Sequence, residues 1–123
     1  MKVDWEVAVS DNLKNKIGSL ANDIPLMTQI HMQFRAMCTP YVPYLEGVLS
    51  DTTEVTHEYV RWSQPYAHYQ YVGISPNGKA FNYTKEQHPL ATSQWDKAMM
   101  RDVGDDFTQR VQELVNWRAN QLL

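Results

Sequence analysis

Cysteine is almost absent from this sequence, which contains only Cys38, so no disulfide can form within the chain. A chain that folds without disulfides is typical of a reducing compartment, and we expect this protein to mature in a cytoplasm. The sequence also lacks an apolar stretch close to its first residues, and we therefore expect no signal peptide. No run of apolar residues approaches the length of a membrane span, so we expect no membrane partner.

Basic charge is scarce too. The 11 Lys and Arg residues are outnumbered by 14 Asp and Glu, which gives a formal net charge of −3. The basic residues are scattered along the chain, whereas proteins that hold the nucleic-acid backbone carry a clustered basic face. We therefore expect no sequence-specific binding of nucleic acid.

The familiar catalytic signatures are missing as well. The sequence contains no P-loop, no G-x-S-x-G, no H-E-x-x-H and no C-x-x-C motif. We therefore expect neither an enzyme nor a bound cofactor or metal. What the sequence does contain is 123 residues, 43% of them hydrophobic, which is enough to bury one core without disulfides. We expect a single domain over residues 1–123.

Helical periodicity is present in two long stretches. The first begins after Asp23 and Pro25, which suit a helix start, and must end near Cys38 because Pro40 disfavours a helical conformation at Thr39. Its apolar residues recur at spacings of four, four and three, which predicts about four turns of amphipathic helix. They are Leu26, Ile30, Phe34 and Met37. Residues 12–21 predict a short helix before it, or the two stretches form one long helix kinked at Pro25.

The strongest periodic signal lies at the C-terminal end. Apolar residues recur there at spacings of four and three over about five turns, after a cap at Thr92 or Ser93. Gly104 is a candidate bend point in this helix. The apolar residues are Trp95, Met99, Val103, Phe107, Val111 and Leu114.

Strand patterns occupy residues 3–9, 48–56 and 59–62, with a tight turn at 57–58 between the last two. Val60 and Trp62 fall on one face of the 59–62 strand, opposite Arg61. Residues 39–47 read as an extended connector packed on the domain, and 79–83 as a short further strand. The predicted fold is α+β, a small antiparallel β-sheet packed on one face by an N-terminal helical region and a long C-terminal helix.

Two candidate chemical sites are less favoured than structural roles for the same residues. His57, Glu58 and Arg61 could support acid–base catalysis in a small nuclease, but a polar hairpin turn is the preferred interpretation. His68, Glu86 and His88 could meet and bind a metal, although widely spaced histidines are a weak signal. Cys38 is expected to be a small buried hydrophobe.

Residues 61–73 hold an unusual density of large rings, and we do not expect all of them to fit into a core of this size. Positions 66–72 fit either a helical turn or a strand. Exposed aromatic residues usually mark association surfaces, and no converging polar groups indicate a ligand pocket, so we favour an interface. Its rings are Trp62, Tyr66, Tyr69 and Tyr71.

Three motifs together resemble a known family. Residues 40–43 read PYVP and are followed by EGVL at 46–49. Residues 60–73 read VRWSQPYAHYQYVG, and His88-Pro89 is followed by Trp95 and Ala98. These motifs, in this order, resemble those of the small minor capsid proteins of tailed bacteriophages, and the similarity extends from about Val3 to Ala98.

The resemblance implies a virion structural protein of the head–tail connector, related to head–tail joining or tail-completion proteins. Such a protein assembles in the host cytoplasm as a hexameric or dodecameric ring between neck, portal-side connector and tail proteins, and DNA only passes through its channel. A tail terminator of the same neck is the alternative. A ring subunit needs two different patches, for which we expect residues 61–73 and the outer face of the 91–123 helix. The expected interface residues are Tyr41, Tyr44, Arg61, Trp62, Tyr66, Tyr69 and Tyr71, with Trp62 turned toward the core.

Overall fold

A computed structural model of the chain describes residues 20, 22–43, 53–64, 66–81, 83, 88 and 90–122. The expected strand at 3–9, the expected helix at 12–21 apart from residue 20, residues 48–52 of the next expected strand, and Tyr44 lie outside these residues. The described elements are α2 (Ile24–Cys38), the 3₁₀ turn η2 (Thr39–Tyr41), β1 (Thr53–Val55), β2 (Val60–Trp62), α4 (Ala67–Val72) and α5 (Trp95–Leu122).

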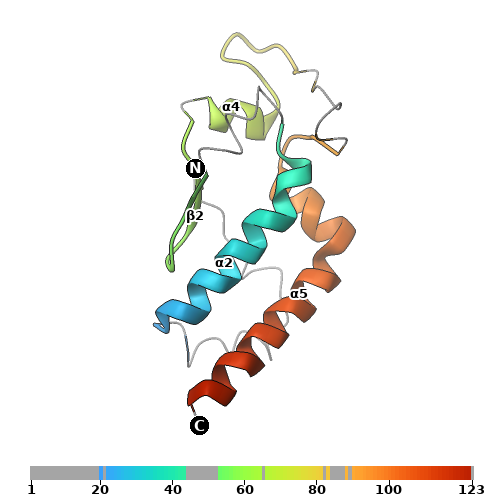
Figure 1. Ribbon diagram of the computed structural model, residues 1–123. Coiled ribbons are helices and arrows are strands. Elements are labelled where there is room, and N and C mark those ends of the chain that lie inside the picture. The colour runs from blue at the N-terminus through green and yellow to red at the C-terminus, as the bar shows by residue number, and fades with distance from the viewer. Residues whose placement is uncertain are drawn as a thin grey trace.

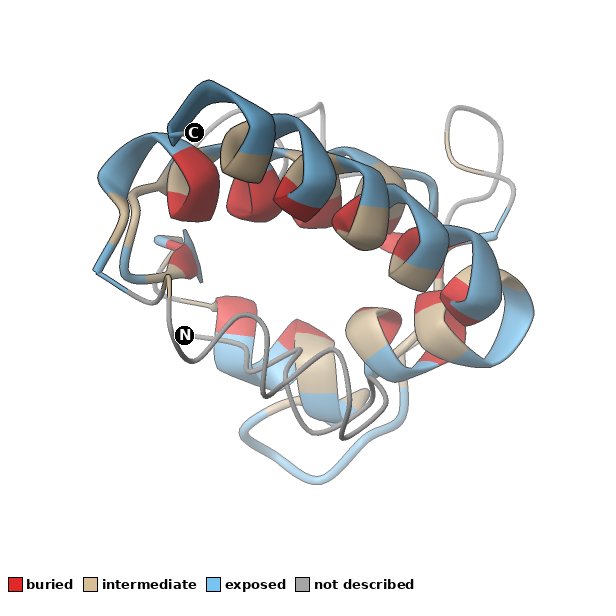
Figure 2. Ribbon diagram, turned by 90° about the horizontal axis from the view of Figure 1, so that it is seen from below, coloured by how far each residue is buried: buried red, intermediate tan, exposed pale blue. Residues whose placement is uncertain are grey.

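Two antiparallel helices, α2 and α5, lie side by side and form the frame of the molecule (Figure 1). The hairpin β1–β2 lies beside α2, and α4 lies at the end of the frame where α2 ends and α5 begins (Figure 1). Figure 2 shows the molecule from below, after a turn of 90° from Figure 1. In this view the buried residues of α5 face the interior and the outer side of the helix is exposed. This arrangement confirms the predicted α+β class. No helix in the described part of the chain combines the length and apolar character needed to cross a bilayer.

The start of α2 follows the sequence pattern closely. Asp23 caps the helix, because its Oδ1 accepts a hydrogen bond of 2.9 Å from the Leu26 amide. The predicted stripe is buried at Leu26, Ile30 and Phe34, and is half-buried at Met37.

The end of α2 differs from the prediction. The helix does end at Cys38, but Thr39 keeps helical angles (φ −52°, ψ −43°) although Pro40 follows it. Both the amide and the hydroxyl of Thr39 donate to the Arg35 carbonyl, the hydroxyl at 2.8 Å, and these bonds hold the residue against the steric preference. The first part of the expected extended connector is therefore a 3₁₀ turn, which packs on the domain and buries Tyr41.

The two short strands form the predicted antiparallel hairpin, with Val55 opposite Val60 and Thr53 opposite Trp62. Thr56 stabilises the turn, because its Oγ1 accepts hydrogen bonds from the amides of Glu58 and Tyr59, each at 3.1 Å. Val60 and Trp62 are buried and Arg61 is exposed, as the alternation predicts. His31 on α2 donates through Nδ1 to the Thr56 carbonyl at 2.8 Å and ties the turn to the frame.

A kink divides α5 next to the predicted bend point. Val103 leaves the helical region (φ −135°, ψ 22°) immediately before the buried Gly104. Beyond the kink the buried face runs regularly through Gly104, Phe107, Val111 and Val115, while Val103 and Leu114 are half-buried. Phe34 of α2 meets Phe107 edge-to-face at 5.5 Å, and this contact joins the two helices beyond the kink.

The predicted cap of α5 at Thr92 or Ser93 is wrong. The helix begins at Trp95, so the preceding residue is Gln94, which has a φ of 46°. Tertiary hydrogen bonds determine this geometry, since the Gln94 amide donates to the Tyr71 carbonyl at 2.8 Å and the Thr92 amide donates to that of Tyr41 at 3.0 Å.

A partly buried ion pair closes the other end of the frame. Nε of Arg118, near the end of α5, lies 2.9 Å from Oδ1 and 3.0 Å from Oδ2 of Asp23, at the start of α2. The Leu26 amide, and after it Arg118, hold the pKa of Asp23 below its ordinary value of 3.8. The ionised form of Asp23 is therefore the one that stabilises the folded chain.

We expect Asp23→Asn to reduce the loss of free energy of unfolding that occurs as the pH is lowered into the acid range. Because the folded pKa lies below the unfolded one, the contribution of Asp23 is complete above about pH 5 and is lost as the pH falls through 3.8 toward the folded value. Asn keeps the helix cap but cannot ionise. Urea unfolding between pH 2.5 and 6 measures the slope, and equal slopes for the variant and the parent contradict this account.

Candidate assembly interface

The aromatic segment predicted from the sequence is anchored by Trp95, the first residue of α5, which is fully buried. Its ring receives two edge contacts. Trp62 of β2 meets it at 5.5 Å with an interplanar angle of 64°, and Tyr71 of α4 meets it at 5.0 Å and 89°. Edge-to-face pairs of this kind add to the free energy of burial. Trp95 therefore fixes both ends of the segment that runs from β2 into α4.

A polar contact reinforces the attachment of α4. Burial, and after it a hydrogen bond with Asp96, raises the pKa of Tyr71 above the ordinary value of 10.0. The carboxylate oxygen Oδ1 of Asp96 is buried and has no hydrogen-bond partner among the described residues. The hydroxyl of Tyr71 thus satisfies part of a carboxylate that is otherwise poorly paired.

A structured hairpin, residues 73–81, follows α4. Gly73 ends the helix in the left-handed region (φ 84°), and a Cβ at this position would lie 3.1 Å from that of Ser93, so the close approach requires glycine. An antiparallel bridge pairs Ile74 with Ala80, and the Phe81 amide donates to the Gly73 carbonyl at 3.0 Å. The predicted strand at 79–83 is therefore a single bridge within the described residues.

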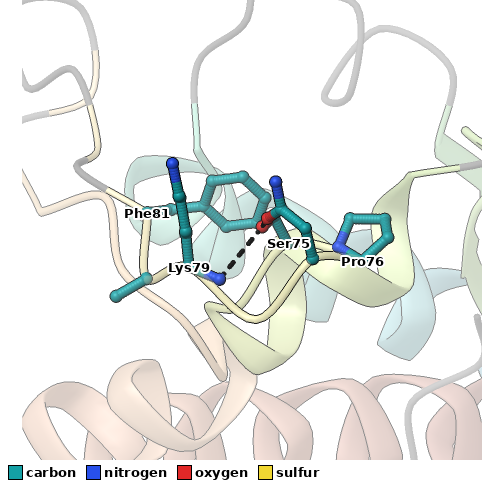
Figure 3. A pocket seen from close by; sticks show the side chains of 6 residues that line it. Ser75, Pro76, Lys79 and Phe81 are labelled. Carbon is teal, nitrogen blue, oxygen red and sulfur yellow. Dashed lines mark hydrogen bonds between the residues drawn. The ribbon is translucent and has the colours of Figure 1, made fainter.

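The base of the hairpin is tied back to α4. The hydroxyl of Tyr83 donates to the carbonyl of Gln70 at 2.6 Å. Near the tip, Oγ of Ser75 accepts from the Lys79 amide at 3.2 Å and also contacts the side-chain oxygen of Asn77 (Figure 3). α4 and the hairpin therefore form one connected unit on the Trp95 anchor.

The outward side of this unit is apolar. Tyr69 is 37% exposed and Ile74 is 48% exposed, and Val72 shares the helix face of Tyr69 at a spacing of three. We call Tyr69, Val72 and Ile74 the α4 patch. Of these residues the sequence pattern singled out only Tyr69. Val72 and Ile74 were missed because 66–72 fitted a strand as well as a helix, and only the helical spacing places 69 and 72 together.

The other predicted interface residues divide into two groups. Trp62, which is 1% exposed, and Tyr41 are buried, so neither side chain is open to a second subunit in this structure. Tyr41 donates to Oδ2 of Asp102 at 3.2 Å and joins η2 to α5. Tyr66 and Tyr71 are half-buried, whereas Arg61 is exposed. The interface role of these residues stays a prediction, which now depends on the exposed ones.

The structure places His57 and Glu58 together at the hairpin turn, whereas His68 and His88 have different partners. Nε2 of His57 is 3.3 Å from Oε1 of Glu58 in an exposed pair at the hairpin turn. His68 contacts the ring of Tyr69, while His88 donates through Nδ1 to the Val42 carbonyl at 2.7 Å. The residues that the structure describes, among which Glu86 is not included, contain no cluster of three potential metal ligands.

Cys38 is fully buried in the core, as predicted for a small hydrophobe. Burial raises the pKa of its thiol, and the nearby Asp96 raises it further. The reactive thiolate is therefore strongly disfavoured at neutral pH.

The profile of a family described as minor capsid protein matches residues 8–114, which is most of the chain. The chain belongs to this family. The minor capsid protein is thus a structural component of a phage virion and contacts other virion proteins. No curated protein and no solved structure matches the sequence significantly. The motifs at 40–49, 60–73 and 88–98, on which the resemblance was based, all fall within the matched range.

We expect Tyr71→Phe to lower the free energy of unfolding by about 1–2 kcal/mol at neutral pH, because Asp96 loses a buried partner. The free energy of unfolding of the variant should also fall less steeply than that of the parent as the pH rises above 10. A folded pKa above 10.0 means that the contribution of Tyr71 is complete below pH 10 and declines as the pH rises beyond it. Urea unfolding between pH 7 and 11.5 tests both effects, and an unchanged alkaline slope contradicts the second.

Proposed function

We propose that this minor capsid protein is a subunit of the head–tail connector, where its copies form a ring that joins the filled capsid to the tail and surrounds the DNA exit channel. The observation that carries the proposal is the α4 patch. It is an exposed apolar face held on a rigid anchor, in a chain whose family supplies virion structure. Contiguous apolar patches of this kind usually mark contacts between proteins.

The charge of the chain supports the same role. A formal net charge of −3 gives little attraction for DNA phosphates, which suits a channel through which DNA must pass without being held. A ring subunit needs complementary surfaces rather than catalytic groups, because it acts by binding its neighbours.

The double variant Tyr69→Ala/Val72→Ala tests the proposal in virions. A phage lacking a working copy of the gene is complemented from a plasmid, and tailed and tailless particles are counted by electron microscopy. We expect filled tailless heads and free tails, with tailed particles reduced at least about 30-fold, because central interface residues are worth about 2 kcal/mol or more. Alanine favours helix, so α4 should remain folded.

Met32→Ala is the matched control, since Met32 is an exposed apolar side chain on α2, outside the α4 patch. It should yield tailed particles at the parental level. A parental yield from the double variant removes the α4 patch from the proposal. Normal tailed particles in the complete absence of the protein refute the connector role itself, and overlong tails instead assign the protein to tail termination.

A further inference from the structure

A second aromatic anchor is exposed on α5. Trp117 is 42% exposed on the outer part of the helix beyond the kink. Glu113, also exposed, lies one turn earlier and therefore on the same face. Within the described part of the chain, no ion pair engages the Glu113 carboxylate. α5 thus presents an indole and a free carboxylate side by side.

A shallow pocket, open to solvent and with a mainly apolar lining, lies in the 73–81 hairpin. Its volume is about 430 Å³, and it is lined by Ser75, Pro76, Asn77, Lys79, Ala80 and Phe81. Figure 3 places the Phe81 ring and the Lys79 side chain on one side of this pocket and Pro76 on the other. Lys79 is exposed, and among the described residues its ammonium has no carboxylate partner.

We infer that Trp117 of one copy inserts into the hairpin pocket of the next copy, with Glu113 paired to Lys79 of that neighbour. The inference rests on the proposed ring and names the contact between its adjacent subunits. Proline and aromatic side chains line apolar pockets for an indole, and a lysine beside an indole gains a cation–π contact. The carboxylate one turn away then meets the same ammonium.

The contact must be between copies rather than within one chain. The hairpin is attached to the start of α5 through Tyr71 and Trp95, whereas Trp117 lies near the other end of that helix. At 1.5 Å per residue, roughly 30 Å of helix separates Trp117 from Trp95. Because the two surfaces are different, each copy offers one surface to each of its two neighbours, and such head-to-tail contacts form a ring when the rotation between copies closes.

Disulfide cross-linking in assembled particles tests the contact. The variant Asn120→Cys/Ala80→Cys keeps Trp117 and places one cysteine on the same exposed helix face and the other in the pocket lining. It is supplied to the phage that lacks the gene, and purified particles are mildly oxidised. We expect a ladder of covalent oligomers on a non-reducing gel, because the contact brings the two Cα atoms within the roughly 7 Å that a disulfide can span. Asn120→Cys alone should give no dimer, because a head-to-tail contact keeps equivalent residues apart. Cys38 is buried and should not contribute.

A charge exchange supplies an independent measurement. Lys79→Glu and Glu113→Lys should each reduce the yield of tailed particles at least about tenfold by placing like charges together, and the combined variant should recover it. Asp105→Lys is the control, because Asp105 is an exposed carboxylate elsewhere on α5. No ladder in particles that contain the double-cysteine variant, a dimer from Asn120→Cys alone, or no recovery on charge exchange overturns the inference. If the contact fails these tests but the variant protein is still found at the neck of the particles, the inferred contact is wrong and the connector role stands.

Discussion

The position of α4 on the frame depends on the burial of one indole. Trp95 is the first residue of α5, and the edges of Trp62 and Tyr71 pack against it from β2 and α4. The same junction sets the unusual backbone at Gln94, whose amide donates to the Tyr71 carbonyl. A six-residue helix such as α4 is too short to be stable alone, so its position is a property of this junction.

The rest of the chain determines where Trp117 and the 73–81 hairpin lie relative to each other. The edge-to-face contact of Phe34 with Phe107 and the Asp23–Arg118 pair hold α2 against the part of α5 beyond the kink. That frame keeps Trp117 at one end and the 73–81 hairpin at the other. In the proposed ring, two different surfaces held at a fixed separation are what a head-to-tail contact between copies requires.

Much of the frame could be predicted from the sequence, because the stripes of α2 and α5 and the alternation of Val60 and Trp62 report burial directly. Local rules failed where tertiary contacts decide, as at Thr39, which stays helical before proline, and at Gln94, which precedes α5. Spacings of three and four both suit a helix face, so Leu114 was chosen and Val115, four residues after Val111, was missed. For the candidate site, ring density located the segment, but only the fold shows that Trp62 and Tyr41 are buried and that Val72 and Ile74 are exposed.

We propose that the α4 end of this minor capsid protein is a surface between subunits in the neck of the virion. An image reconstruction of that neck by electron cryomicroscopy tests it most directly. The account predicts a closed ring of this chain with α4 and the 73–81 hairpin at each boundary between adjacent copies. A neck that lacks the protein, or a ring in which the α4 patch faces solvent, contradicts it.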